Sequence, residues 1–296
     1  MYDIIVVGAG PAGLTAALYA RRANKSVLVL DAKGYGGQII NTYMIENYPG
    51  IANISGFDYA TNLYNQVKDM GVVIKTETVV RVEEDKTVVT NKNKYNGKAV
   101  ILATGVENRK LKVDGESEFT GKGVSYCATC DGNFYKNKVV AVIGGGNTAM
   151  EEALYLSDIA KEVYLICRSD KFHGEERYLD ELKKKDNVKL IMNSNVVKIN
   201  GDKVLESIDV KDNDDNIQNI LVNGLFIAVG QEPKNEIFTN VVEINDYGYF
   251  VSEDGVHTKT SGIYIAGDAR EKDLRQLTTA VADGSIAATI AVKEMK

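Results

Sequence analysis

One order of features occurs twice in this chain: an apolar run, a glycine-rich turn, a helical stretch and a second apolar run. The first copy begins with the apolar residues 4–7, turns at residues 8–13, and continues with apolar positions at helical spacing from Leu14. It closes with the apolar run 27–30 and then Asp31. Strand, glycine turn, helix, strand and acid form the order of a dinucleotide-binding βαβ unit. The pattern predicts an α/β fold built on a parallel sheet.

The first glycine turn has the chemistry of a phosphate cradle. Gly8 allows a tight turn, Gly10 lets the backbone approach a pyrophosphate, and Gly13 lets the helix pack closely on the strand. The start of the helix offers N–H groups and the positive end of its dipole to the phosphates. Asp31 can accept hydrogen bonds from a ribose. The flanking strand, helix and acid make a bound dinucleotide a better explanation than an ordinary tight turn.

The second copy departs from the first at its end. It runs through the apolar residues 139–143, the turn Gly144-Gly145-Gly146, a helix that includes residues 150–160, and a strand over residues 163–167. The strand ends in Cys167-Arg168-Ser169, with no carboxylate where the ribose of NAD would need one. The repeat predicts two cofactors, or one cofactor and the relic of a second site.

Two further segments complete the first unit by their chemistry. Residues 100–106 predict a strand running into a Thr-Gly turn, and residues 263–270 predict a strand ending at Gly-Asp before a helix that starts near Arg275. The carboxylate of Asp268 could bind a cofactor hydroxyl or a pyrophosphate-bound water, or it could cap the helix. Joining these segments to the first turn requires the second unit to be an insertion.

The predicted fold is therefore α/β, with two Rossmann-like dinucleotide-binding domains, the second inserted into the first. We place the first, discontinuous domain at residues 1–109 and 237–296, and the inserted domain at residues 110–236. At 296 residues the chain is long enough for each domain to bury a core of its own.

Composition and charge limit the classes of partner that the protein can bind and indicate its location in the cell. The net charge of −6 arises from interspersed signs without a basic stripe, which disfavours nucleic acid and anionic membranes as partners. The sequence MYDIIVVGAG has no cationic leader region, and no apolar run approaches the length of a membrane span. Three cysteines do not make the disulfide framework of a secreted protein. We expect a cytoplasmic location.

The stretch SYCATCDG, residues 125–132, carries the reactive side chains. Cys127 and Cys130 can close a small disulfide, and the Cys-x-x-Cys spacing commonly lowers the pKa of a thiol. The alternatives are half of a structural zinc site or two buried thiols. Because Cys167, His173 and His257 offer no second pair at ligand spacing, we predict no metal. Asp131 could handle protons beside a dithiol or could cap a helix.

These residues resemble a known family, the low-molecular-weight thioredoxin reductases, over essentially the whole chain. The motifs that carry the resemblance are GAGPAGLTAALYARRA, GYGGQI, IENYPGI, ILATGV, GKGVSYCATCDG, GGGNTAMEEALYLSDIA and AGDAREKDLRQLTTAVADGSIAA. The resemblance implies FAD in the discontinuous domain, a pyridine-nucleotide-type fold in the inserted domain, a homodimer, and thioredoxin as the partner. It also implies a swing of the inserted domain between two orientations.

Carried over residue by residue, the resemblance implies that Cys130 faces the flavin, that Cys127 attacks the substrate disulfide, and that Asp131 is the general acid or base. It places the FAD pyrophosphate at Gly8, Gly10, Pro11, Ala12 and Gly13. It places the adenosine side at Asp31, Ala32, Gly37 and Gln38. The remaining cofactor-binding residues, several of them near the flavin, are Asn47, Ala103, Thr104, Gly105, Gly267, Asp268, Ala269, Arg275, Gln276 and Leu277.

The electron donor is where the sequence departs from this family. Relatives that use NADPH carry a His-Arg-Arg-x-x-x-Arg pattern that grips the 2′-phosphate, whereas residues 167–173 here read Cys-Arg-Ser-Asp-Lys-Phe-His. Each missing charge-assisted bond costs about 1.5–3 kcal/mol. NADPH is therefore a doubtful donor, and we expect reduced ferredoxin, as in one subgroup of the family. The alternatives are an ordinary NADPH-dependent thioredoxin reductase and a flavin-binding redox sensor without turnover.

Overall fold

The structure is a computed structural model that describes residues 1–42 and 44–295. The chain separates into two compact units: Met1–Glu107 together with Glu232–Lys296, and Asn108–Gln231. The sequence predicts that the chain passes from one unit to the other after residues 109 and 236, whereas in the structure it does so after residues 107 and 231. At these crossings the short strands β7 (Glu107–Asn108) and β16 (Gln231–Glu232) pair with each other.

The first unit is built on a seven-stranded sheet with the order β3-β2-β1-β6-β5-β4, in which β17 also pairs with β6. Its strands are β1 (Tyr2–Val7), β2 (Val27–Asp31), β3 (Val73–Thr76), β4 (Val79–Val82), β5 (Thr87–Thr90), β6 (Lys94–Leu102) and β17 (Ile263–Ile265). The strands β3, β2, β1, β6 and β17 are parallel, and β4 and β5 add an antiparallel hairpin. The carboxyl ends of β1, β2, β6 and β17 therefore lie along one edge of the sheet.

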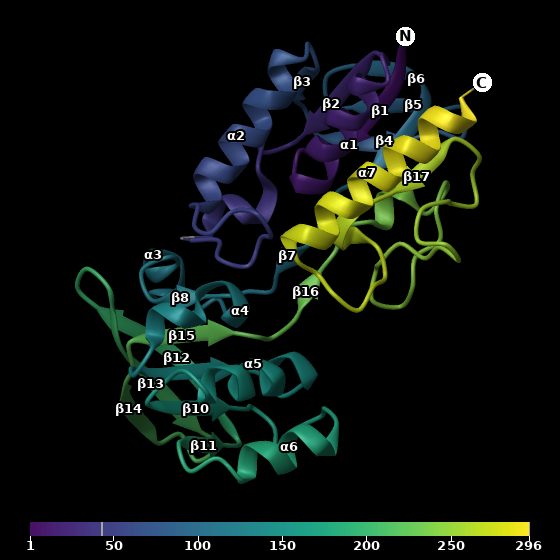
Figure 1. The fold of residues 1–296 in the computed structure, drawn as a ribbon. Helices are drawn as coiled ribbons and strands as arrows, with labels where there is room; N and C mark the ends of the chain where they lie inside the picture. The colour runs from purple at the N-terminus through teal and green to yellow at the C-terminus, as the bar shows by residue number, and fades with distance from the viewer. Residues whose placement is uncertain (43, 296) are drawn as a thin grey trace. The chain divides into compact units, whose positions relative to one another are not determined.

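Both faces of this sheet are covered, which explains the continuous apolar runs of its central strands. On one face, Ile4 and Val6 of β1 pack with the helices α1 and α7, which lie side by side (Figure 1). On the other face, Ile5 and Val7 pack with residues of the 238–250 segment. The helices and 3₁₀ turns of this unit are α1 (Pro11–Arg22), η1 (Gly37–Asn41), α2 (Gly56–Asp69), η3 (Glu236–Phe238), η4 (Gly267–Ala269) and α7 (Leu277–Glu294).

The second unit repeats this plan on a five-stranded parallel sheet with the order β11-β10-β9-β15-β8. Its strands are β8 (Val124–Ser125), β9 (Val139–Ile143), β10 (Glu162–Ile166), β11 (Val188–Ile191) and β15 (Gly224–Ile227). Its helices and 3₁₀ turn are α3 (Glu116–Phe119), α4 (Ala128–Asp131), η2 (Gly132–Tyr135), α5 (Asn147–Ser157) and α6 (Glu176–Lys183). The predicted strand over residues 163–167 is β10, shifted by one residue.

Two layers cover the second sheet. On one face of the sheet, side chains that include Val140 and Val142 pack with residues of α4, α5 and α6. The other set, including Ala141 and Ile143, packs against an antiparallel three-stranded sheet of β12 (Ser194–Gly201), β13 (Leu205–Asp212) and β14 (Ile217–Leu221). The α/β prediction with two Rossmann-like sheets is confirmed, because both parallel sheets carry a strand–glycine turn–helix–strand unit at their centre.

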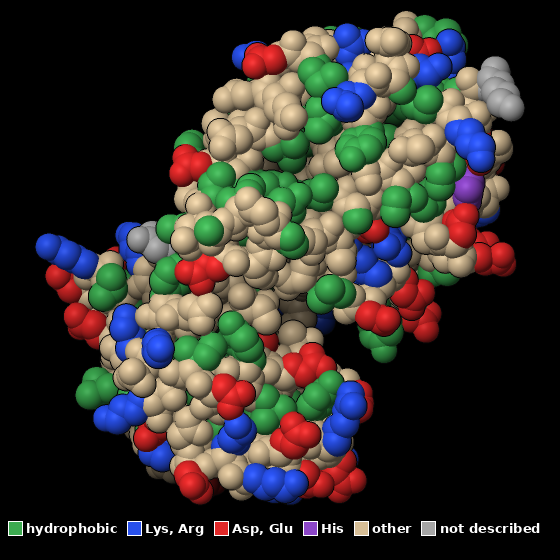
Figure 2. Space-filling model, in the orientation of Figure 1, with side chains coloured by type: hydrophobic (Ala, Val, Ile, Leu, Met, Phe, Trp, Pro, Cys, Tyr) green, Lys and Arg blue, Asp and Glu red, His purple; other side chains and the backbone are tan. Residues whose placement is uncertain are grey.

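The surface agrees with the interspersed charges of the sequence. Lys and Arg side chains alternate with Asp and Glu side chains over the face displayed in Figure 2. Among the described residues, none of the helices has both the length and the apolar character that a bilayer span requires.

Candidate functional site

The first glycine turn is shaped by close backbone approaches. Gly8 has φ +108°, and a Cβ there would lie 2.1 Å from the carbonyl oxygen of Ala103. A Cβ at Gly13 would lie 1.9 Å from the carbonyl oxygen of Gly8. Only glycine fits both positions, because the neighbouring atoms belong to the backbone and have little freedom to move. The turn therefore brings the end of β1, the start of α1 and the residues after β6 together.

The start of α1 is open to an anion. Gly10 is the N-cap residue and Pro11 the first helical residue, and no side chain caps the helix or places an acid in its first turn. The N–H groups of the first turn of a helix lack partners within the helix, so they suit a phosphate. A Cβ on Gly37 would lie 3.1 Å from the Cα of Gly10, which places the Gly37–Gln38 segment against the turn.

Asp31 lies where the ribose acid is predicted, at the end of β2. Its Oδ2 accepts a hydrogen bond from the Ala9 amide at 2.8 Å, and its Oδ1 accepts one from the Lys33 amide at 2.8 Å. A carboxylate oxygen can accept a further hydrogen bond, so Asp31 both holds the glycine turn and retains acceptor capacity. Ala32 is exposed beside it, and Gln38 donates to the Val106 carbonyl oxygen at 3.1 Å.

The Gly-Asp segment after β17 lies against the same turn. Gly267 has φ +78°, and a Cβ there would lie 2.8 Å from the Cβ of Ala12. Farther along α7, a Cβ at Gly284 would lie 2.1 Å from the carbonyl oxygen of Ala12. The insertion of the second unit therefore leaves the two halves of the first unit in direct backbone contact around α1.

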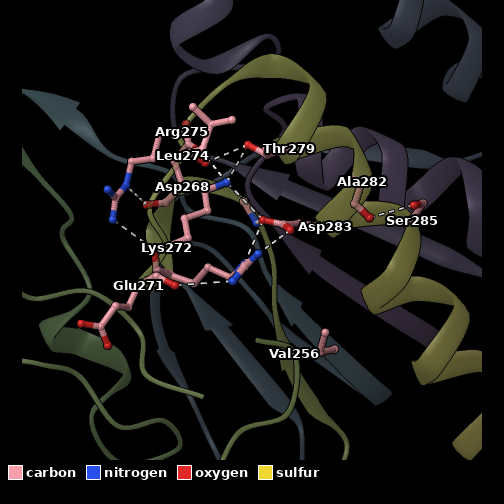
Figure 3. A network of polar contacts seen from close by, with 12 residues as sticks. Val256, Asp268, Glu271, Lys272, Leu274, Arg275, Thr279, Ala282, Asp283 and Ser285 are labelled. Carbon is pink, nitrogen blue, oxygen red and sulfur yellow. Dashed lines mark hydrogen bonds and ion pairs between the residues drawn. The ribbon is translucent and has the colours of Figure 1, made fainter. Parts of the chain in front are cut away.

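A buried network of opposite charges holds Asp268 in place (Figure 3). Its carboxylate pairs with Lys272 Nζ at 2.8 Å, and Lys272 also reaches Asp283 at 3.2 Å. Asp283, whose side chain is 8 % exposed, accepts from Arg270 Nη2 at 2.7 Å and from the Gly267 amide at 3.1 Å. The charges of the two acids and the two bases thus balance. The hydrogen bond from the Gly267 amide to Asp283 fixes the turn that carries Asp268.

The remaining predicted cofactor residues form two further contacts. Asn47 Nδ2 donates to Gln276 Oε1 at 3.0 Å, across 229 residues of sequence. Gln276 is the N-cap residue of α7 and forms a reciprocal capping box with Thr279, so α7 begins at Leu277 and not at Arg275. Arg275 lies over the ring of Tyr249 at 4.1 Å and donates to the Asp268 carbonyl oxygen.

Asn235 is a residue that the sequence did not single out. It is fully buried, accepts from the Thr104 hydroxyl at 2.9 Å, and donates to the carbonyl oxygens of Gly248 and Ala269. It therefore links the turn formed by Ala103, Thr104 and Gly105 to the Gly-Asp segment. No local pattern marks it, because its partners are distant in sequence.

These residues fit a dinucleotide such as FAD. The first unit offers an uncapped helix start, two glycines at which a Cβ would collide with backbone, and an acid at the end of the second strand. An anionic pyrophosphate needs the N–H groups and the close approach, and a ribose needs the acid.

The second unit holds the disulfide centre. Cys127 and Cys130 form a disulfide, with Cys127 as the N-cap residue of α4 and Cys130 inside it. The structure therefore does not have the two free buried thiols of the alternative interpretation. Among residues 1–42 and 44–295, no cluster of His, Cys, Asp and Glu could hold a metal ion.

Asp131 lies directly behind the disulfide. Its Oδ2 accepts from the Ser125 hydroxyl at 2.6 Å, and Ser125 Oγ in turn accepts from the Cys127 amide at 3.1 Å. Its Oδ1 is inaccessible and has no hydrogen-bond partner in the described part of the chain. Burial raises the pKa of Asp131, and the bond from Ser125 opposes that shift. The side chain of Asp131 caps neither α4 nor the following turn η2.

Two side chains that the sequence did not select also support this turn. Ser125 connects Asp131 to Cys127, and Glu152 of α5 accepts a hydrogen bond from the Ala128 amide at 3.2 Å. Helical spacing could have identified Glu152, because it lies between the buried residues Ala149, Ala153 and Leu156 on the inner side of α5.

The second glycine turn resembles the first but ends differently. Gly146 is the N-cap residue of α5, without a side-chain cap, and a Cβ on it would meet nothing within 4 Å. Cys167 is a buried free thiol, and a Cβ on Gly145 would lie 2.6 Å from its Sγ. The following loop folds back, with the His173 amide donating to the Gly145 carbonyl oxygen at 2.7 Å. The side chains of Arg168 and His173 are exposed there.

Comparisons with known proteins place this geometry among redox enzymes. The family model described as pyridine nucleotide-disulphide oxidoreductase matches residues 2–284. The chain is 41 % identical to a thioredoxin reductase of Listeria monocytogenes, over 99 % of this chain and 93 % of that protein. It is 40 % identical to one of Treponema pallidum, over 97 % and 95 %. It superposes on the crystal structure of thioredoxin reductase from Streptococcus pyogenes with a TM-score of 0.94 and 38 % identity, covering 99 % and 97 %.

Proposed function

The chain belongs to the low-molecular-weight thioredoxin reductases, within the pyridine nucleotide-disulphide oxidoreductases, and we propose that it reduces thioredoxin through Cys127–Cys130 with FAD as its cofactor. Under this proposal the first unit is the FAD-binding domain, and the second is the pyridine-nucleotide-type domain that carries the disulfide. The observation that carries the proposal is the disulfide beside a half-buried acid, in a chain whose first unit fits a dinucleotide.

The cofactor proposal uses the residues around the start of α1. The N–H groups that begin at Gly10 would hold the pyrophosphate, Asp31 would hold the ribose, and Asp268 would bind from the segment after β17. Bound FAD would supply a carrier that accepts electrons one or two at a time and delivers them as a pair.

The exchange chemistry follows from the second unit. With the pair reduced, the Cys127 thiolate attacks one sulfur of the thioredoxin disulfide, which forms a mixed disulfide and releases one thioredoxin thiolate. Cys130 then attacks Cys127 Sγ, which reforms the Cys127–Cys130 bond and releases the second thiolate. Asp131 can pass a proton from Cys130 to a leaving sulfur, because burial raises its pKa and Oδ1 has room for a proton.

The test uses single substitutions at the centre. Cys127→Ser and Cys130→Ser should each abolish thioredoxin reduction while the purified protein keeps its flavin spectrum. Asp131→Asn should slow turnover and change its pH profile while the disulfide still forms. Near-normal turnover in either Cys variant would remove the exchange proposal, and purified protein without affinity for FAD would remove the cofactor proposal. Full flavin reduction without thioredoxin turnover in the wild type would favour the redox sensor.

For the donor, we propose a one-electron carrier such as reduced ferredoxin, with NADPH as the alternative. Support for ferredoxin comes from the loop after β10, where Ser169 and His173 take positions that carry arginines in NADPH-using relatives. Support for NADPH comes from the uncapped start of α5, which still suits a pyrophosphate. Anaerobic mixing decides between them: rapid flavin bleaching by micromolar NADPH, without a response to reduced ferredoxin, would reject the ferredoxin proposal.

A homodimer and a cytoplasmic location complete the proposal. The resemblance to the family supports the first, and the composition supports the second. Sedimentation of the purified holoprotein tests the dimer, which predicts twice the chain mass of 32.4 kDa. Cell fractionation tests the location.

A further inference from the structure

Glu152 is a half-buried acid that the proposed exchange does not use, although it touches the redox turn. Its Oε1 accepts a hydrogen bond from the amide of Ala128, the residue that directly follows Cys127 and begins α4. Its Oε2 is inaccessible to solvent and has no hydrogen-bond partner among the described residues. The carboxyl therefore has one oxygen bound to the turn and one free to hold a proton.

The position of Glu152 on α5 is not that of a solvated surface acid. Its neighbours on the same side of the helix, Ala149, Ala153 and Leu156, are fully buried, whereas the adjacent Glu151 is exposed. A carboxyl on the apolar side of a helix is costly to bury unless it makes a specific contact. The contact available here is the first amide of α4.

The surroundings of Glu152 leave its charge adjustable. The pKa of Glu152 is raised to about 7, chiefly by burial and also by the Glu151 carboxylate, whereas the hydrogen bond from the Ala128 amide lowers it. The titratable groups at the redox turn that packs against α5 are Asp131, the cysteine pair and Tyr135 of η2. On the other side, α6 carries Tyr178, which bonds to Glu151, together with Glu176, Arg177, Asp180, Glu181 and Lys183. From β9 and β10, the residues packed there are apolar.

Reduction changes the charge next to this carboxyl. A dithiol reductant breaks the Cys127–Cys130 bond and leaves two electrons on the two sulfurs. If one sulfur takes a proton, the other remains a thiolate at the start of α4, a position that stabilises it. Its negative charge disfavours an ionised carboxylate nearby, so the carboxyl can balance the second electron by taking a proton from solvent.

We propose that Glu152 is a positioning residue of the Cys127–Cys130 centre: its carboxyl holds the first amide of α4 and takes up a proton when the pair is reduced. This inference rests on the proposed disulfide exchange. It assigns separate tasks to the two acids, with Asp131 passing protons to sulfur and Glu152 adjusting its charge to the redox state of the pair.

Matched substitutions separate the charge of Glu152 from its hydrogen bond. Glu152→Gln keeps an oxygen that can accept from Ala128 and removes the titrating charge, whereas Glu152→Ala removes both. Asp158→Asn is the control, because it changes an exposed acid at the end of the same helix that does not act on Glu152. The measurement is the rate of alkylation of the dithiothreitol-reduced holoenzyme as a function of pH, which reports the thiol pKa.

Glu152→Gln should lower the apparent thiol pKa by roughly one unit, which is a tenfold gain in thiolate at a pH below it. Asp158→Asn should leave the alkylation profile unchanged. A purely structural Glu152 predicts that the Gln variant keeps the wild-type profile, since its hydrogen bond survives. That result would overturn the inference.

A second measurement does not depend on the folding of a Glu152 variant. The infrared difference spectrum between reduced and oxidised Asp131→Asn protein should show a protonated carboxyl band that appears on reduction. Lack of this band would overturn the proposal. Failure of the proposed function has a different signature: wild-type protein reduced by dithiothreitol would then not exchange with oxidised thioredoxin, whatever the behaviour of Glu152.

Discussion

The two βαβ units of this chain share a turn and differ in what completes it. In both, a glycine without a side-chain cap starts the helix: Gly10 before α1 and Gly146 before α5. In the first unit an acid contacts the turn, because Asp31 at the end of β2 accepts a hydrogen bond from the Ala9 amide. In the second unit the corresponding residue is Cys167, a buried thiol that lies beside Gly145. A shared fold therefore does not fix a shared ligand, because the residue at the end of the second strand decides what the turn can recognise.

The units also differ in how tightly their turns are packed. Gly13 leaves no room for a Cβ beside Gly8, whereas Ala149 occupies the equivalent position of the second turn with its methyl group buried. Around the first turn, a further layer of charges, Asp268, Lys272 and Asp283, fixes the loop after β17. Both turns exclude a Cβ at their first glycine, Gly8 and Gly144, and the first turn is more constrained than the second at the third position of the pattern.

The largest expected effect comes from breaking that charged layer. Asp283→Ala should destabilise the protein by about 3–5 kcal/mol, because it removes the buried partner of Arg270, leaves Lys272 paired with Asp268 alone and leaves the Gly267 amide without its acceptor. The amount of FAD bound to the purified protein should decrease as well. Denaturant unfolding and the flavin content of the purified protein measure the two effects. The exposed Asp273→Ala is the control, and equal behaviour of the two variants would contradict the role given to Asp283.

The next effect compares the two turns directly. Gly13→Ala should cost roughly 1–3 kcal/mol and weaken FAD binding, because its Cβ would lie 1.9 Å from a backbone oxygen. Gly146→Ala should change stability by less than about 0.5 kcal/mol, because its Cβ would meet nothing within 4 Å. Thermal unfolding and FAD titration measure both. A Gly13→Ala protein that matches wild type in both assays would show that the first turn is no more constrained than the second.

A gain-of-function variant tests whether the second turn differs from the first in the ligand that it recognises. Ser169→Arg with His173→Arg should improve flavin reduction by NADPH by about tenfold or more, since each restored charge-assisted bond is worth about 1.5–3 kcal/mol. NADH is the control, because it lacks the 2′-phosphate that the arginines would bind. Equal gains with NADH and NADPH would mean that the loop after β10 does not select the phosphate.

The smallest effect concerns the far end of α7 in the first unit. His257 lies between Asp254 and Glu294, and these carboxylates raise its pKa above the ordinary value of 6.5. Because the folded-state pKa is raised, the stabilisation is complete below pH 6.5 and is lost as the pH rises through the raised value. At these exposed side chains we expect only a few tenths of a kcal/mol. The check is the unfolding free energy of wild type minus that of His257→Gln, which should shrink from about pH 6 to about pH 9.

Much of the fold could be predicted because its signals are local. The apolar runs predicted β1, β9 and the neighbouring strands, and a helix was predicted after each glycine turn. Both helices begin three residues earlier than predicted, α1 at Pro11 and α5 at Asn147. The boundaries of β1, β2 and β10 differ by one or two residues, whereas β6 begins at Lys94 and not at residue 100, because hydrogen bonding to a partner strand extends or ends a run that hydrophobicity alone defines. The start of α7 differs for a related reason: the capping box between Gln276 and Thr279 sets it.

The site was less predictable where distant residues meet. Cys127, Cys130 and Asp131 lie in one short motif, so their chemistry was visible before the structure. Asn235 was not selected, because its partners are remote in sequence and it has no motif of its own. Glu152 lies within a quoted motif, but its contact with Ala128 joins two segments that are separate in sequence. The contact between Asn47 and Gln276 is of the same kind.

The sequence by itself determined the two glycine turns, the Cys-x-x-Cys pair with its acid, and the lack of an acid after the second turn, since each depends on residue types at short spacing. Only the tertiary structure decided which carboxyls are buried, where Asp268 finds its counter-charges, and which side chain holds the first amide of α4. Burial and charge balance are properties of the environment that the whole chain builds around a residue, so the environments of Asp131, Glu152 and Asp283 could be assigned only once the fold had brought their neighbours together.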